Sequence, residues 1–209
     1  MAYTLHGAWL SGPTYKAALM LELCGQKWSY QHLDMRAGAH KKPEYLKKNR
    51  YGQAPCLEDG DLSLCQSAAI LEYLAEKHGK FGGKSAADKA RAREWMFWDF
   101  DRLAPYIYRP RAAARGIRQF PPDVLAAYKA EGDAGLAVLE GELKGKTFLV
   151  GNEPTIADIE VFGTVWYATE AQVDLAKYPN ISAWMGRVQA LPGFKLPYDL
   201  LPKESRAAA

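Results

Sequence analysis

The segment APCLEDGDLSLCQSAAILEYLAEKHG, residues 54–79, decides how the first part of the chain folds. Asp59-Gly60 is a dipeptide typical of β-hairpin turns, and the short apolar runs on either side of it indicate two paired strands. The residues that follow carry apolar side chains at helical spacing, with Ser67 as the expected N-cap and Gly79 as the expected stop. We therefore predict a hairpin that leads directly into a helix.

The residues before this segment alternate between strand-like and helix-like patterns. The expected elements are a strand at 3–6, a turn at 11–13, a helix that ends at Gly25, a strand at 27–35 and a short helix opened by Pro43. Together with the hairpin and its helix they give the order β-α-β-α-β-β-α. This order predicts an α/β domain over residues 1–79.

The sequence changes character after this domain. Residues 80–85 are rich in glycine and polar side chains, which is typical of a linker. Ser85 and Asp88 form a capping-box pattern that opens a long helical segment, and we expect a kink in that segment at Pro105. The chain from residue 86 to residue 209 is therefore predicted to be an all-helical domain.

Three more helices are expected in this second domain, near 122–143, 156–171 and 181–191. Thr155 and Asp158 repeat the capping-box pattern at the start of the middle one. The final residues, ESRAAA, offer little to pack and are expected to fray.

Composition and charge exclude several classes of protein. Of the 209 residues, 48% are hydrophobic and 24% are charged, as in ordinary globular proteins, and no apolar run approaches the ~18 residues that span a bilayer. The net charge of +3 is too small for a nucleic-acid-binding surface. The first residues show no basic leader with an apolar core, so we expect a cytoplasmic protein that binds neither nucleic acid nor membrane.

The cysteines and histidines argue against metal and hydrolase sites. Cys24, Cys56 and Cys65 are odd in number and lack CxxC spacing, so we expect separate, reduced thiols and no zinc site. The four histidines form no HExxH pair, and no serine lies in a GxSxG motif. Neither a bound metal nor a hydrolase triad is expected.

Two blocks of sequence resemble the glutathione transferase family. Residues 40–79 are similar to its glutathione-binding signature, and FLVGNEPTIADI, residues 148–159, is similar to its second-domain signature. The resemblance covers nearly the whole chain and implies a thioredoxin-like α/β domain with a mixed four-stranded sheet, followed by an all-α domain. His40-Lys41, the GQAP run at 52–55 and Ser11 before a proline look most similar to the serine-dependent phi and theta classes and their bacterial relatives.

The resemblance implies that Ser11 stabilises the thiolate of glutathione. Lowering a thiol pKa from ~8.5 by about two units requires roughly 2.7 kcal/mol of selective thiolate stabilisation. One hydrogen bond to a charged group supplies ~1.5–3 kcal/mol and a helix N-terminus adds ~0.3–1 kcal/mol. Two alternatives remain open from the residues alone: Ser11 is only an N-cap, or Thr14 is the hydroxyl that contacts the thiol.

The resemblance also implies which residues hold the rest of glutathione. A γ-glutamyl group needs hydroxyls and N–H groups at a helix start, a cysteinyl backbone needs a strand partner beside a cis proline, and a glycyl carboxylate needs polar or cationic donors. The implied residues, in that order, are Gln66 and Ser67; Ala54 and Pro55; and His40, Lys41 and Gln53.

Two other nucleophile classes in the family are disfavoured. The tyrosine-dependent classes have their phenol at the end of the first strand, where this chain has His6 and Gly7. The cysteine-dependent relatives need a thiol at the start of the first helix, and Cys24 lies at its far end.

The resemblance further implies a homodimer and a second substrate, an apolar electrophile bound against the second domain. The residues expected to line its site are Trp9, Tyr106, Tyr108, Arg109 and Trp166, although the same aromatic spacing is typical of a helix core. Two functions other than a transferase are also compatible with the sequence. One is a non-catalytic binding or assembly protein with this fold, and the other is a specialised glutathione-dependent lyase, dehalogenase, isomerase or peroxidase.

Overall fold

The computed structural model describes residues 2–208, and the contacts within the chain divide it into two units. The first unit comprises the residues up to Lys80 together with those from Leu191 onward, and the second comprises Phe81–Ala190. Each unit has its own set of elements. None of the helices between residues 2 and 208 is both long and apolar enough to cross a membrane.

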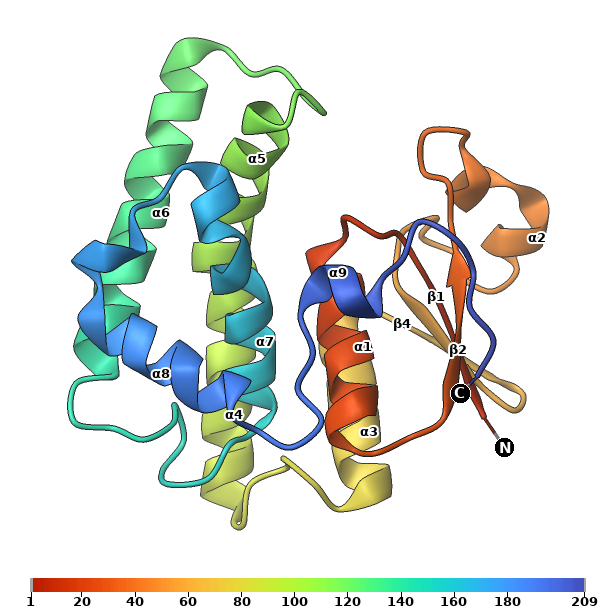
Figure 1. Cartoon of the computed structure of the whole chain (residues 1–209), viewed down its shortest axis with the longest axis horizontal. Helices are drawn as coiled ribbons and strands as arrows, with labels where there is room; N and C mark the ends of the chain where they lie inside the picture. Colours follow the sequence, from red (N-terminus) through yellow and green to blue (C-terminus); the bar gives the residue numbers. More distant parts are fainter. Residues whose placement is uncertain (1, 209) are drawn as a thin grey trace. The chain divides into compact units, whose positions relative to one another are not determined.

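The first unit contains a mixed four-stranded sheet, as expected. The strand order is β2-β1-β3-β4, with β1 parallel to β2 and the other neighbours antiparallel. Helices α1 and α3 lie side by side on one face, and α2 lies on the other side of the sheet (Figure 1). The elements are β1 Tyr3–Gly7, α1 Gly12–Leu23, β2 Trp28–His32, η1 Ala39–Lys41, α2 Pro43–Leu46, β3 Cys56–Asp59, β4 Leu62–Cys65, α3 Ser67–His78 and α9 Pro197–Leu200.

The hairpin and its helix confirm most of the local prediction. Gly60 adopts φ +59° in the two-residue loop between β3 and β4, and Gly79 ends α3 with φ +62°. The helix start is corrected by one residue, because Gln66 is the N-cap of α3 and Ser67 is its first residue. Gln66 has φ +74°, which is costly for a residue other than glycine and is typical of functional sites.

The C-terminal segment makes its contacts mainly within the first unit. The residues from Leu191 onward group with that unit by their contacts, whereas the sequence pattern assigns them to the helical domain. Two residues near the end of the described chain contact β2: Arg206 forms an antiparallel bridge with Tyr30, and Ser205 Oγ accepts a hydrogen bond from the backbone N–H of His32 at 2.9 Å. The physical reason is that β2 is an edge strand, whose outward backbone groups offer the tail a partner.

The second unit is helical throughout, and the structure describes every residue in it. Its elements are α4 Ala86–Trp98, the π-helical turn η2 Asp99–Leu103, α5 Ala104–Ala114, α6 Pro122–Glu142, α7 Ile156–Val165, η3 Trp166–Ala171, η4 Leu175–Lys177 and α8 Pro179–Gln189. The interruption expected at Pro105 lies before it, because the long helical segment passes through the π-helical turn Asp99–Leu103. Pro105 falls in the first turn of α5, where a missing N–H costs little.

The capping box of α7 is the buried polar centre of the second unit. Asp158 is fully buried, and its Oδ2 accepts hydrogen bonds from the backbone N–H of Thr155 at 2.8 Å and from its hydroxyl at 3.2 Å. Its Oδ1 accepts from the N–H of Leu149 at 2.9 Å and from Trp184 Nε1 at 2.8 Å. One carboxylate therefore ties the start of α7 to α8 and to the loop before α7.

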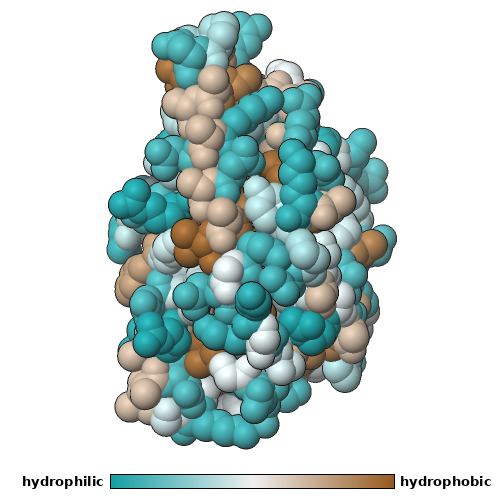
Figure 2. Space-filling model, turned by 90° about the vertical axis from the view of Figure 1, so that its left-hand side faces the viewer, coloured by the Kyte–Doolittle hydropathy of each residue, from teal (hydrophilic) through white to brown (hydrophobic). Residues whose placement is uncertain are grey.

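The surface is mainly polar where it is shown. On the face drawn in Figure 2, hydrophilic residues predominate and hydrophobic residues occur in small groups. Several large apolar side chains among residues 2–208 are exposed, and Phe97 is 71% exposed.

The hairpin also carries a pH-dependent contact. Hydrogen bonds from Lys77 and Tyr73 hold the pKa of the Asp59 carboxyl below its usual value. Because the folded-state pKa is lowered, the contact stabilises the protein above the unfolded pKa of about 3.9 and is lost as the pH falls through the folded value. We expect Asp59→Asn to decrease the free energy of unfolding slightly at neutral pH, since water screens the exposed Lys77.

Urea denaturation of the wild type and Asp59→Asn at neutral and strongly acidic pH measures this effect. The difference between the two proteins should vanish in acid. Asp61→Asn, in the same turn and exposed, is the control that should change neither midpoint. An Asp59→Asn effect that persists unchanged in acid contradicts the assignment.

Candidate functional site

The register of the sheet brings three separate segments to one end of it. β1 ends at Gly7, and the preceding residue, His6, lies opposite Cys56 at the start of β3. Cys56 in turn lies opposite Cys65 at the end of β4. The segments after β1, before β3 and after β4 therefore leave the sheet at the same end.

Ser11 lies at this end as the N-cap of α1. Its Oγ accepts a hydrogen bond from the backbone N–H of Thr14 at 3.2 Å, and the residue is only half-buried. The capping bond uses a lone pair of the hydroxyl, so the O–H proton remains for a second, negatively charged acceptor. The N-terminus of the 12-residue helix favours the same negative charge.

Thr14 occupies a different environment. It is fully buried, and its side chain packs on Gly7 so closely that an added Cβ there would lie 2.1 Å from Thr14 Cγ2. Its Oγ1 is buried without a hydrogen-bond partner among residues 2–208. Of the two hydroxyls weighed from the sequence, Ser11 is the more accessible.

The loop before β3 has the shape expected of a strand partner. The Ala54-Pro55 peptide bond is cis, and the carbonyl of Gln53 accepts hydrogen bonds from Tyr45 Oη and Asn49 Nδ2, both at 2.6 Å. Within the described chain, the backbone N–H and C=O of Ala54 make no hydrogen bond. This residue therefore offers one donor and one acceptor to an extended ligand.

Ser67 has a buried polar group that the rest of the described chain does not satisfy. It is 2% exposed, and its Oγ has no hydrogen-bond partner among the described residues. A buried hydroxyl without a partner is destabilising, and this one lies in the first turn of the 12-residue helix α3. An anionic group at that helix start would satisfy both the hydroxyl and the helix dipole.

The two basic candidates lie in η1, beside the same loop. Lys41 Nζ donates a hydrogen bond to the carbonyl of Gly52 at 3.0 Å, which places its charge next to Gln53. His40 is half-buried, and its Nδ1 has no hydrogen-bond partner within residues 2–208. The Gln53 side chain is exposed.

The residues predicted to bind an electrophile divide between the units. Trp9 belongs to the first unit, with its ring centroid 6.1 Å from that of Tyr198 and Lys203 Nζ 4.7 Å from its centroid. The other four belong to the second unit, and each contacts a neighbouring group there. Tyr106 and Arg109 pack on Tyr128, Tyr108 Oη donates to the carbonyl of Gly163 at 3.0 Å, and Trp166 lies near Phe162.

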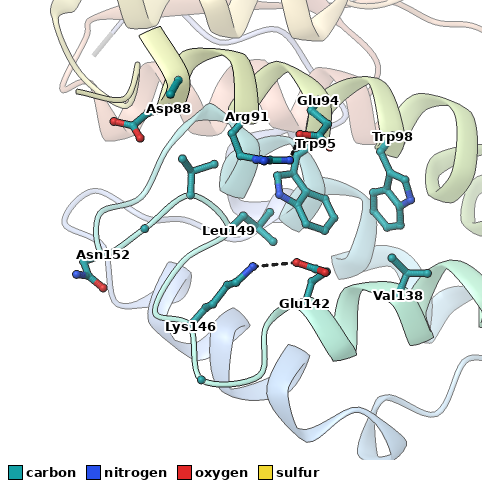
Figure 3. A pocket seen from close by; sticks show the side chains of 14 residues that line it. Asp88, Arg91, Glu94, Trp95, Trp98, Val138, Glu142, Lys146, Leu149 and Asn152 are labelled. Carbon is teal, nitrogen blue, oxygen red and sulfur yellow. Dashed lines mark hydrogen bonds and ion pairs between the residues drawn. The ribbon is translucent and has the colours of Figure 1, made fainter. Parts of the chain in front are cut away.

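The second unit also contains a cavity that the sequence did not indicate. It has a volume of about 830 Å³ and is lined by Trp95, Trp98, Val138 and Leu149, with the ion pairs Arg91–Glu94 and Lys146–Glu142 at its edge (Figure 3). None of the predicted electrophile residues lines it. The aromatic run WMFWDF was the available signal, and its spacing is typical of a helix core.

Two supporting features of the first unit were also missed. Tyr45 and Asn49 hold the Gln53 carbonyl, and no motif marks either residue. Cys24, Cys56 and Cys65 are free cysteines, as expected, but the sequence pattern did not indicate that Cys56 and Cys65 lie opposite each other in the hairpin. The Asp59-Gly60 dipeptide, counted outward as the turn, would pair Cys56 with Ser63; the loop is Gly60-Asp61, and this shift of one residue brings Cys65 opposite Cys56.

Comparison with known proteins gives a consistent result over both units. Residues 1–76 match the family model for the glutathione S-transferase N-terminal domain, and residues 112–192 match that for the C-terminal domain. A probable glutathione S-transferase, GSTF2, from Oryza sativa subsp. japonica is 31% identical over 198 residues, covering 90% of this chain and 92% of the relative. The disulfide-bond oxidoreductase YfcG of Escherichia coli (strain K12) is 29% identical, covering 85% of this chain and 86% of the relative.

Solved structures agree with these relatives. The crystal structure of a glutathione S-transferase from Pseudomonas fluorescens is 32% identical, with a TM-score of 0.89, and the match covers 94% of this chain and 99% of that one.

Proposed function

Because the chain belongs to the glutathione S-transferase family, we propose that it activates the thiol of glutathione for attack on an apolar electrophilic small molecule, with Ser11 stabilising the thiolate. One observation carries the proposal. An accessible Ser11 hydroxyl, an unpaired Ala54 backbone and an orphaned Ser67 hydroxyl lie at the same end of one sheet. Ser11 can donate a hydrogen bond to a thiolate, Ala54 can pair with a peptide backbone, and Ser67 can donate to a carboxylate.

We assign each part of glutathione to one group of residues. The γ-glutamyl carboxylate accepts from Ser67 and the N-terminus of α3, with Gln66 beside it. The cysteinyl backbone pairs with Ala54 beside the cis proline. The glycyl carboxylate accepts hydrogen bonds from the Lys41 ammonium group, an N–H of the His40 ring and the Gln53 side-chain amide.

The chemical step follows from these positions. The thiol of glutathione loses its proton to solvent, and the Ser11 hydroxyl donates to the resulting thiolate while the helix dipole of α1 stabilises its charge. The thiolate then attacks the electrophile. A carbon–sulfur bond forms, and a leaving group departs or a proton adds to the neighbouring carbon.

A direct test measures turnover of glutathione with an activated aryl chloride and, in parallel, with an organic hydroperoxide. The proposal expects the glutathione conjugate of the aryl ring, identified by mass spectrometry. Turnover of the hydroperoxide alone favours a peroxidase. Binding of glutathione without a shift in its thiol pKa and without any turnover favours a non-catalytic binding protein.

The similarity to YfcG favours a second candidate, reduction of small disulfides. The same glutathione thiolate would attack a disulfide sulfur, release one thiol and leave a mixed disulfide with glutathione. An assay with a small dialkyl disulfide in place of the aryl chloride distinguishes the two activities.

Replacing Ser67, whose buried hydroxyl has no partner among the described residues, should weaken glutathione binding without destabilising the fold. Ser67→Ala removes an unsatisfied buried group, so we expect the free energy of unfolding without ligand to stay equal or to rise. The affinity for glutathione should fall about tenfold or more, because a hydrogen bond to a carboxylate is lost. Calorimetric titration and urea denaturation measure the two quantities.

Ser63→Ala is the matched control, an exposed serine in β4 of the same unit. It should change neither quantity. A Ser67→Ala protein that is strongly destabilised yet binds glutathione normally would show that the hydroxyl has a structural role.

We also propose a homodimer in the cytoplasm, with the first unit of one subunit on the helices of the other, as the family resemblance implies. Light scattering at micromolar concentration measures the mass of the particle. A monomer contradicts this assembly and leaves the chemistry of Ser11 untouched.

A further inference from the structure

The hairpin places two cysteines directly opposite each other. Asp59 and Leu62 flank the two-residue loop and form the hydrogen-bonded pair that closes it. Pair types alternate along an antiparallel ladder, so Cys56 and Cys65, three steps away, form a non-hydrogen-bonded pair. In such pairs the Cα atoms are ~4.5 Å apart, within the range of ~4.4–6.8 Å that a disulfide requires.

The two sulfur atoms also converge on one acceptor. Cys56 Sγ and Cys65 Sγ each donate to the carbonyl oxygen of Lys48 at 3.6 Å. Residues directly opposite in a ladder extend to the same face of the sheet, which agrees with this shared contact. The Cα separation typical of this pair type and the shared face of the two side chains are therefore compatible with a disulfide.

The two thiols differ in access. Cys56 is completely buried beside Leu33 and Tyr45, whereas Cys65 is only partly buried. Burial raises the pKa of the Cys56 thiol to about 12 and also raises the pKa of the Cys65 thiol. Both are therefore mainly protonated at neutral pH, so their reactions with disulfides are slow and Cys65 is the one that a reagent reaches first.

We propose that Cys56 and Cys65 are a redox-active dithiol that a low-molecular-weight disulfide, such as glutathione disulfide, oxidises to a cross-strand disulfide. The Cys65 thiol loses its proton to solvent and attacks one sulfur of the reagent, which breaks the S–S bond and releases one thiol. The Cys56 thiol then loses its proton and attacks the Cys65 sulfur, which releases the second thiol. Two protein thiols are oxidised, and one disulfide is reduced to two thiols.

The position of this dithiol gives it a link to the candidate site. Cys56 follows Pro55 directly, and Cys65 precedes Gln66 directly. A bond between them ties together the two segments that carry Ala54 and Ser67. The dithiol reaction itself needs no bound glutathione and no transferase activity, so its test is independent of the proposed function.

Cys24 supplies a control within the same chain. It is the buried C-cap of α1, and burial raises the pKa of its thiol to about 11, but it lies outside the strands and so has no cross-strand partner. A reagent that oxidises buried thiols in general would modify Cys24 as well. A reagent that acts through the geometry of the hairpin would spare it.

The full-length protein is incubated overnight with glutathione disulfide in a mildly alkaline buffer, quenched with an alkylating agent, and analysed by intact-mass spectrometry and peptide mapping. We expect the wild type to lose two of its three free thiols, with a Cys56–Cys65 link, no added glutathionyl group and full reversal by dithiothreitol. Cys24→Ser should behave like the wild type. Cys56→Ser should stop at a glutathionyl adduct on Cys65, and Cys65→Ser should remain unmodified.

Phenylarsine oxide, which bridges two neighbouring thiols, gives a second measurement that does not depend on oxidation. One molecule should bind the folded wild type, and none should bind Cys56→Ser or Cys65→Ser when circular dichroism shows that they are folded. The proposal is overturned if the wild type keeps three thiols and binds no arsenical. It is equally overturned if oxidation stops at a glutathionyl adduct or joins Cys24 to either partner.

Discussion

Replacing Ser11 with alanine should raise the pKa of the bound glutathione thiol by about one to two units, because the hydrogen bond to a charged acceptor, worth ~1.5–3 kcal/mol, is lost. The same loss lowers kcat/KM by roughly 10- to 150-fold. The helix dipole of α1 remains, so part of the thiolate stabilisation should survive. The ultraviolet thiolate band of bound glutathione, followed from about pH 5 to 9, measures the shift directly.

Two further variants separate the catalytic role of Ser11 from its capping role. Ser11→Asp keeps a good N-cap, but an ionised aspartate has no proton to donate. The free energy of unfolding should therefore stay the same, whereas the bound glutathione should no longer form a thiolate at neutral pH. Ser11→Thr keeps both functions and should retain most of the activity. Thr14→Val alters only the buried hydroxyl packed on Gly7 and should leave the thiol pKa unchanged.

If the pKa of the bound glutathione thiol is unshifted in both the wild type and Ser11→Ala, Ser11 acts only as the N-cap of α1. A thiolate that survives Ser11→Ala but disappears in Thr14→Val would move the role to Thr14. Either result would leave the family assignment in place, because the assignment rests on both domains.

The largest stability loss should come from Asp158→Ala. The carboxylate accepts four hydrogen bonds in a fully buried position, and its removal leaves the N–H groups of Thr155, Leu149 and Trp184 without an acceptor. Each buried unsatisfied donor costs ~1–3 kcal/mol, and partial relaxation brings the total to about 3–5 kcal/mol. The midpoint of urea denaturation, followed by tryptophan fluorescence, reports the change.

Asp158→Asn should be nearly as destabilising as Asp158→Ala, because the NH₂ group of the new side chain would face N–H groups that need an acceptor. Asp88→Ala is the matched control. Asp88 fills the same position in the capping box of α4, where its contacts with Ser85 and Lys84 are exposed to water. Its removal should cost much less, and equal losses at the two positions would contradict burial as the cause.

Much of the local structure is determined by residues near one another in the sequence. The capping boxes at Ser85 and Thr155 and the stop at Gly79 form where their patterns predict, and the hairpin forms with its loop at Gly60-Asp61, one residue after the predicted turn. Each depends on contacts within a few residues, so short-range chemistry is enough to specify it. The family resemblance then added the sheet type and the candidate site residues.

Other features depend on contacts between distant residues, and no local pattern encodes them. Arg206 pairs with the edge of β2, and Gly7 admits the side chain of Thr14, because the fold brings these segments together. The Ser67 hydroxyl lacks a hydrogen-bond partner among the described residues because the packed chain brings no polar group into hydrogen-bonding position beside it.

The sequence alone thus determined most of the helices and strands and, through its resemblance, the family. Only the tertiary structure decided that Ser11 is accessible while Thr14 is buried, that the tail covers β2, and that Cys56 faces Cys65. The physical reason is that exposure and pairing are properties of the packed chain. They arise from backbone register and burial, which a list of residue types does not contain.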